Sequence, residues 1–298
     1  MCGIVGLYLK DAGLRPRLGA LFGPMLAQMS DRGPDSAGFA IYRDEDADAS
    51  KACVYDPAED TDWQAVAARM SADLGAPVAS DRVASHAILR GKVTSDAMRK
   101  WLNDACPGTR IMSTGTSLEI YKEIGLPAEV MTRFGVSQMA GSHMIGHTRM
   151  ATESAVTTEG AHPFSTGEDL CLVHNGSLSN HNDLKRMLIR EGLTFQTEND
   201  SEVAAGYLSW RMSNGETLKE ALTAALDDLD GFYTFTVGTR DGFAVLRDPI
   251  ACKPAVMAET DQWVAMASEF RSIAQLPGVE NATVWEPKPG IVYHWGRN

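Results

Sequence analysis

Residues 1–9 read Met-Cys-Gly-Ile-Val-Gly-Leu-Tyr-Leu, and the interpretation of the whole chain starts from this stretch. The run is rich in β-forming side chains, so we predict a strand that begins almost at residue 2. A methionine before a small residue is usually trimmed, which would make Cys2 the first residue. A terminal α-amine has a pKa of about 8 and can take a proton from the adjacent thiol. Nucleophile and base would then lie in one residue, although a lone Cys at this place is more often a small buried residue.

A second informative segment is GHTRMATES, residues 146–154. It places Arg149 and Thr152 at the end of an expected strand. An arginine offers a planar fork of donors that suits a carboxylate held by two bonds. The plainer alternative is a surface arginine in a salt bridge.

Two more segments carry polar groups beside apolar runs. LVHNGSLSNHNDL (172–184) contains Asn175 and Gly176, and a side-chain amide next to a glycine N–H supplies the donors of an oxyanion hole. Asn-Gly is also a common turn dipeptide. FQTENDSEVAAGYL (195–208) puts Asp200 just ahead of a predicted helix. This aspartate can cap the helix, which is the default interpretation, or bind an ammonium group.

The pattern of strands and helices indicates an α+β layer fold. We predict a helix at residues 18–29, a Gly-Pro turn within 31–38, and a strand at 38–42. Residues 44–141 differ, since they open with an acidic run, carry few strand signals, and suggest helices at 62–74 and 95–105. Strand signals return after residue 142, with six segments and two helices between them: 143–149, 169–176, 232–238, 242–248, 254–259 and 263–269, with helices at 201–212 and 216–226.

Composition narrows the functional class. The 298 residues are 44% hydrophobic with a net charge of −12, which argues against nucleic-acid binding because phosphate recognition needs clustered Lys and Arg. The five cysteines form no C-x-x-C pair, so we expect neither a disulfide framework nor a cysteine-only metal site. No secretory signal and no membrane-spanning run is evident, so we expect a cytoplasmic protein that does not enter a membrane.

Taken together, the motifs resemble class II (Ntn-type) glutamine amidotransferases, a family that includes glutamate synthase and amidophosphoribosyltransferase. MCGIVG, DRGPDSAG, GHTRMAT, AHPF, HNG and ENDSEV occur in the family's order, and RDPIACKPAV and MASEFRSI resemble its later elements. The resemblance covers roughly residues 2–43 and 142–275. It implies a four-layer αββα Ntn-hydrolase sandwich in one domain, residues 2–298, with a helical insertion at about 44–141.

The resemblance also implies a catalytic set. Cys2 would be the nucleophile and its amine the base, and Asn175 with Gly176 would form the oxyanion hole. His147 and His174 precede key residues, and as strand-end histidines they are expected to be structural.

Substrate contacts follow by the same comparison. Arg149 and Asp200 would hold the α-carboxylate and α-ammonium of glutamine, and Thr152 would help to place it. Arg32 and His162 resemble residues that order loops, and no metal ligand is expected. One departure is the acidic residue at Glu153, where family members often carry a neutral one or His.

The chain as a whole resembles the amidotransferase-like subunit of N-methylglutamate synthase, so we expect a hetero-oligomer. The partner would be a glutamate-synthase-like subunit that carries FMN and iron–sulfur clusters, since no flavin phosphate-binding motif or clustered cysteines occur here. Two alternatives stay open. The site could cleave or transfer a γ-glutamyl amide instead of hydrolysing glutamine, or the chain could be a non-catalytic scaffold subunit.

Overall fold

The computed structural model describes residues 2–45, 48–150 and 156–296. Its largest sheet has seven strands in the order β15-β13-β14-β1-β8-β2-β7. All the neighbours in this sheet pair antiparallel. The strands are β1 (Gly3–Leu9), β2 (Ser36–Tyr42), β7 (Leu118–Ile124), β8 (His143–Arg149), β13 (Val256–Glu259), β14 (Trp263–Ala267) and β15 (Thr283–Trp285).

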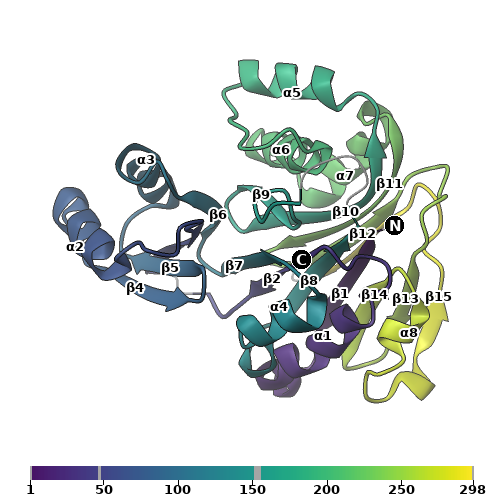
Figure 1. Cartoon of the computed structure of the whole chain (residues 1–298). Coiled ribbons are helices and arrows are strands. Elements are labelled where there is room, and N and C mark those ends of the chain that lie inside the picture. The colour runs from purple at the N-terminus through teal and green to yellow at the C-terminus, as the bar shows by residue number, and fades with distance from the viewer. Residues whose placement is uncertain (1, 46–47, 151–155, 297–298) are drawn as a thin grey trace.

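A second antiparallel sheet stacks on the first (Figure 1) and has the order β16-β12-β11-β10-β9. Its members are β9 (Phe164–Gly167), β10 (Leu170–Leu178), β11 (Gly231–Thr239), β12 (Gly242–Arg247) and β16 (Val292–Gly296). The strands at both ends of the chain therefore meet in two facing layers.

Helices cover the outer face of each sheet, as Figure 1 shows. The seven-stranded sheet is covered by α1 (Leu18–Ala27), α4 (Pro127–Arg133) and α8 (Phe270–Ile273), and the five-stranded sheet by α5 (His181–Arg190), α6 (Asp200–Ser213) and α7 (Leu218–Asp228). This is the predicted four-layer αββα arrangement, which is confirmed. Short 3₁₀ turns lie at Ala12–Arg17, Val136–Gln138 and Val279–Asn281. No helix within the described ranges is long and apolar enough to cross a bilayer.

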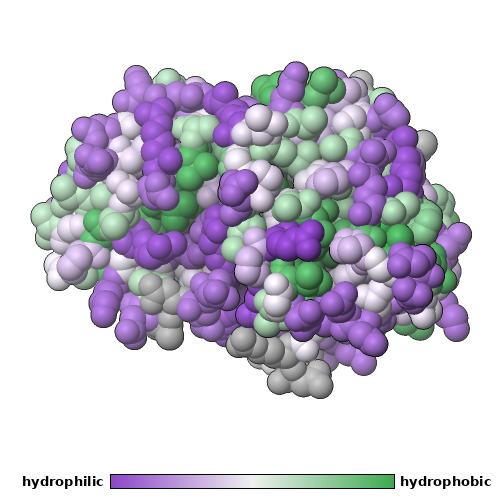
Figure 2. All heavy atoms as spheres, turned by 90° about the horizontal axis from the view of Figure 1, so that it is seen from below, coloured by the Kyte–Doolittle hydropathy of each residue, from purple (hydrophilic) through white to green (hydrophobic). Residues whose placement is uncertain are grey.

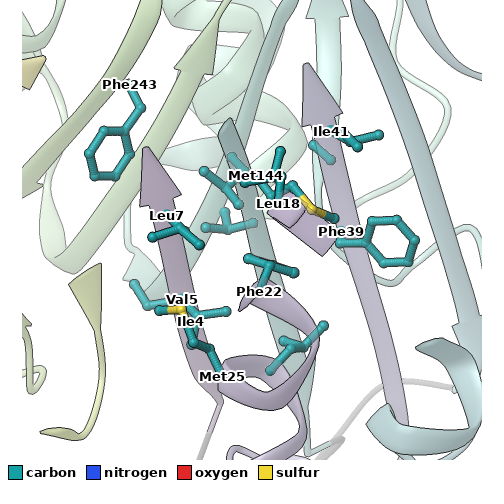
Figure 3. Close-up of a cluster of buried hydrophobic side chains, with 14 of the residues drawn as sticks. Ile4, Val5, Leu7, Leu18, Phe22, Met25, Phe39, Ile41, Met144 and Phe243 are labelled. Atoms are coloured by element: carbon teal, nitrogen blue, oxygen red, sulfur yellow. The ribbon is translucent and has the colours of Figure 1, made fainter. Parts of the chain in front are cut away.

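Strands β1 and β8 are buried on both faces, and small residues make this possible. A Cβ at Gly146 would stand 2.7 Å from Phe22 Cζ of α1, and a Cβ at Gly6 would stand 2.9 Å from Phe243 Cε2 of the second sheet. Figure 3 shows the α1 side chains beneath β1 and β2, with Phe243 on the other side of β1. Such doubly covered strands carry nearly continuous apolar runs, which is why they were easy to predict.

Residues 44–141 need a correction, because they are not simply helical. The predicted helices exist as α2 (Trp63–Leu74) and α3 (Ser95–Ala105). They pack on a four-stranded antiparallel sheet with a core of its own, in the order β4 (Val78–Val83), β5 (His86–Gly91), β3 (Ser50–Tyr55) and β6 (Arg110–Gly115). These strands escaped prediction because polar residues interrupt or flank their short apolar runs, and β4 is a polar edge strand. The following strand, β7, belongs to the main sheet.

Asp169 joins this smaller sheet to the start of β10. One carboxylate oxygen accepts the backbone N–H groups of Ser117 and Leu118, each at 2.9 Å, and the other accepts that of Thr116 at 2.9 Å. The side chain is 6% exposed. A buried carboxylate with this many donors fixes the β6–β7 turn against β10.

Viewed from below, the surface has small apolar patches separated by hydrophilic residues (Figure 2). The apolar residues of the chain are therefore gathered mainly in the interior, where they form three clusters.

Candidate active site

The register of three strands brings the N-terminus to Arg149. Gly3 of β1 lies opposite Thr148 of β8, and Arg149 lies opposite Ser36 of β2. If the β1 register is continued by one residue, Cys2 lies beside Arg149, at the same end of the two strands. Arg149 is 8% exposed, whereas Cys2 is only partly buried. A semi-exposed thiol and a mostly buried guanidinium thus share one end of the sheet.

Two glycines allow this close arrangement. A Cβ at Gly3 would stand 2.9 Å from both Met29 Cβ and Thr148 Oγ1. A Cβ at Gly33 would stand 2.4 Å from the Thr148 carbonyl carbon, so the 31–34 turn rests directly on β8. Larger residues would push the turn or the first strand away from the site.

Arg32 secures the first residues of the chain. Its Nε donates to the Cys2 carbonyl oxygen at 3.1 Å, and its Nη1 is 2.8 Å from Glu269 Oε1. Ser268 closes the arrangement, since its Oγ accepts the Ile4 N–H at 3.0 Å and its own N–H donates to the Ile4 carbonyl. Both residues belong to the MASEFRSI motif, but no role for Glu269 or Ser268 could be predicted from the sequence. The signal was their place in that motif.

The second sheet contributes Asn175 and Gly176 of β10. Asn175 is 3% exposed, and its Nδ2 has no hydrogen-bond partner among the described residues. A buried amide without a partner is costly, so a group that arrives later is the natural acceptor. The Asn-Gly pair lies inside a strand, so the alternative of a simple turn is wrong.

Gly176 lies opposite Tyr233, whose backbone groups both bond to Asp248: the N–H to Oδ1 at 3.1 Å and the carbonyl to the Asp248 N–H at 3.0 Å. Gly176 therefore occupies a non-hydrogen-bonded position, and its N–H points away from β11. Strand β9, on the other side of β10, pairs only with Leu170 and Leu172, so this pairing does not extend to Gly176. A Cβ on Gly176 would stand 2.0 Å from the Phe232 carbonyl oxygen, so only glycine fits.

Asp200 is the first residue of α6, and it does not cap the helix. The cap is Asn199, whose side chain accepts the Ser201 N–H at 2.9 Å. The Asp200 carboxylate instead turns toward β10, where Oδ2 accepts the Leu178 N–H at 2.9 Å. Its other oxygen lies 3.7 Å from His174 Nδ1. The default interpretation of capping was wrong by one residue.

Three buried histidines fill the space behind these groups. The rings of His147 and His162 have centroids 3.9 Å apart, and His174 Nδ1 lies 2.9 Å from Ser201 Oγ. Burial lowers the pKa of His147 to about 3 and that of His174 to about 4, and it lowers the pKa of His162 well below its ordinary value. All three rings are therefore neutral, which agrees with a structural role for His147 and His174.

Thr152 and Glu153 fall in residues 151–155, which lie outside the described residues. Within the described ranges, no three His, Cys, Asp or Glu side chains gather in a way that could hold a metal ion.

Comparison with known proteins identifies the family. The chain is 57% identical over 296 residues to the glutamine amidotransferase-like protein GlxB of Rhizobium meliloti, covering 99% of this chain and 98% of that protein. The chain belongs to the class II glutamine amidotransferases. This amidotransferase is also 32% identical to a putative glutamine amidotransferase of Methanothermobacter thermautotrophicus, over 98% of each chain. The glutamine amidotransferase domain model matches residues 147–275.

Solved structures agree on the fold. Glutamine phosphoribosylpyrophosphate amidotransferase from B. subtilis superimposes with a TM-score of 0.64 at 22% identity. The match covers 99% of this chain and 47% of that protein. The αββα architecture is thus shared with an amidotransferase of very different sequence.

The neutral histidines give a prediction for stability. Because burial depresses their pKa values from 6.5, the unfolded chain binds more protons than the folded one at mildly acidic pH. Their contribution is complete above about pH 6.5 and is lost as the pH falls toward the folded pKa values. Lowering the pH from about 7 to about 5 should reduce the free energy of unfolding by roughly 2 kcal/mol for each of His147 and His174. Urea unfolding at the two pH values measures this, and equal stability at both would contradict neutral burial.

Proposed function

We propose that this amidotransferase hydrolyses glutamine through a thioester on Cys2. The α-amine takes the thiol proton, and the thiolate attacks the γ-carbonyl carbon of glutamine. The tetrahedral oxyanion then accepts hydrogen bonds from Asn175 Nδ2 and the Gly176 N–H. The C–N bond breaks, and ammonia leaves with the proton held by the amine. Water finally cleaves the γ-glutamyl thioester to give glutamate.

The observation that carries this proposal is the unpartnered amide of Asn175. It is buried, it has no acceptor among the described residues, and the next residue is a glycine whose N–H points away from β11. Two donors set in advance at one place stabilise a charge that develops only during the reaction. The register of β1 and β8, in which Gly3 lies opposite Thr148, supports a position for Cys2 beside Arg149.

Substrate binding is proposed for three residues. Arg149 would bind the α-carboxylate with its guanidinium fork, and Asp200 would bind the α-ammonium. Asp200 begins a helix and already accepts the Leu178 N–H, so its carboxylate is fixed in orientation. Thr152 would complete the placement of the substrate.

Arg32 and His162 would order the surroundings without moving protons. Arg32 does so through the Cys2 carbonyl and Glu269. His162 is buried against His147, and burial lowers the pKa of its ring well below the ordinary value, so the ring is a weak proton acceptor.

Replacing the unpartnered amide tests the mechanism. Asn175→Ala should lower kcat for glutamine by roughly 100- to 1,000-fold with a smaller change in KM, because one oxyanion donor is lost. Asn180→Ala is the matched control, since that amide donates to the Asp228 carbonyl and lies beyond the end of β10. Steady-state ammonia release measures both. Equal losses in the two variants, or none in Asn175→Ala, would argue against the oxyanion role.

We further propose that the chain serves an N-methylglutamate synthase or a similar glutamate-synthase-like complex. The resemblance of the whole chain supports this. The partner would carry FMN and iron–sulfur clusters. The proposed contact surfaces are residues 44–141 and residues 285–290. The first range is taken as an insertion in a single domain of residues 2–298.

The same site could instead transfer the γ-glutamyl group to an amine, or cleave a substituted amide such as γ-glutamylmethylamide. Each reaction begins with the same thioester, so the residues do not separate them. A scaffold without catalysis is less well supported, because Cys2, Arg149 and Asn175 are all retained.

Isolation from the native host tests the complex. We expect the chain to co-purify with the flavin-containing subunit and to turn over glutamine faster when that subunit and its acceptor are bound, because partner binding completes the site. Ammonia release with and without the partner is the measurement. A monomer with full activity that ignores any acceptor would refute the complex and leave a simple glutaminase.

A further inference from the structure

Lys122 of β7 is a buried lysine with an unusual set of partners. It is 4% exposed, and its ammonium donates to the backbone carbonyls of Glu159 at 3.1 Å, Ala161 at 2.8 Å and Pro163 at 3.2 Å. An ammonium has three donors, so all of them are used on one stretch of backbone. The Phe164 ring lies beneath the charge, with its centroid 4.5 Å away.

The other buried lysine of this region behaves in the usual way. Lys51 is 2% exposed and forms an ion pair with Glu119 at 3.1 Å. Within the described ranges, Lys122 makes no such pair with a carboxylate. Burying a charge without a counter-ion in contact is expensive, and the carboxylates of Glu202 and Glu159 act on this ammonium only from beyond ion-pair distance. Because Lys51 shows that this chain can pair a buried lysine, the three carbonyls are the feature that sets Lys122 apart.

The segment that Lys122 holds runs along the main sheet toward the active site. A Cβ at Gly38, the residue opposite Lys122, would stand 2.1 Å from the His162 carbonyl oxygen, so the segment lies directly on the strand. The His162 ring then packs on His147, two residues before Arg149. A Cβ at Gly160 would stand 3.4 Å from Arg149 Nη1. Residues 159–163 therefore form a wall beside the guanidinium.

We propose that Lys122 is a positioning residue that fixes residues 159–163 against Arg149 and so prepares the guanidinium to bind the substrate carboxylate. This inference rests on the proposed function, in which Arg149 binds glutamine. Lys122 lies on β7, which β2 separates from β8. In this proposal it therefore acts through residues 159–163 and does not touch the substrate. A neutral donor such as an amide could bond at most two of the three carbonyls.

The kinetic test compares Lys122→Met with Lys51→Met. Each change keeps the apolar stem and removes an ammonium that is almost completely buried. A kinetic effect that came only from lost stability should therefore appear in both variants. Only Lys122→Met should raise KM for glutamine, by about tenfold, with kcat within about twofold, because the acyl-transfer groups are untouched and carboxylate binding is loosened. Matching kinetics in the two variants would overturn the positioning role.

A second measurement is independent of turnover. Amide hydrogen exchange over residues 156–164 should become at least about tenfold faster in Lys122→Met and stay unchanged in Lys51→Met, because only the first variant releases the wall. Equal exchange in both overturns the inference even if the unmodified protein hydrolyses no glutamine, an outcome that would separately defeat the proposed function. Lys122→Gln, which keeps two N–H donors, should give intermediate exchange and KM and serves if Lys122→Met does not fold.

Discussion

The antiparallel register of β1 and β8 is the constraint on which the site depends. Because Gly3 lies opposite Thr148, Cys2, the residue before β1, falls beside Arg149. A slip of the register by one residue would turn every side chain of β1 to the other face of the sheet. Such a slip is costly because Gly6 and Gly146 make room for Phe243 and Phe22 on opposite faces. Core packing and the position of Cys2 are thus set by the same pairing.

The proposed site combines residues from both of the stacked sheets. The first sheet supplies Cys2 and Arg149, whereas β10 of the second supplies Asn175 and Gly176. Between them lie histidines that burial keeps neutral, so the interface adds polar atoms without adding charge. The proposed chemistry therefore relies on sheet packing more than on any single loop, and β10 itself is tied to the smaller sheet through Asp169.

Sequence alone predicted β1, β2, β8 and β10 to β14 of the two main sheets, because burial gives these strands apolar runs that end at polar motifs. It did not predict β7, β9, β15 or β16, which are the edge strands of the same sheets. It missed the smaller sheet, whose short strands alternate weakly, and it took Asp200 for the helix cap where Asn199 does that work. Lys122 gave only a weak signal: in LEIYKEI the alternation of a strand puts it on the same face as Leu118 and Ile120, although a lysine usually faces solvent. The tertiary contacts show that it is buried. Likewise, nothing in the motif revealed that the amide of Asn175 lacks a partner.

The proposed chemistry depends above all on Cys2, which must carry a free α-amine to act as the nucleophile. The most direct measurement is the intact mass and peptide map of active protein treated with the glutamine-mimicking electrophile 6-diazo-5-oxo-norleucine. We expect a chain without the initiator methionine that is modified once, at Cys2, and loses glutaminase activity in proportion to the labelling. Labelling at Cys53, Cys106, Cys171 or Cys252, or an active chain that still carries its methionine, would contradict it.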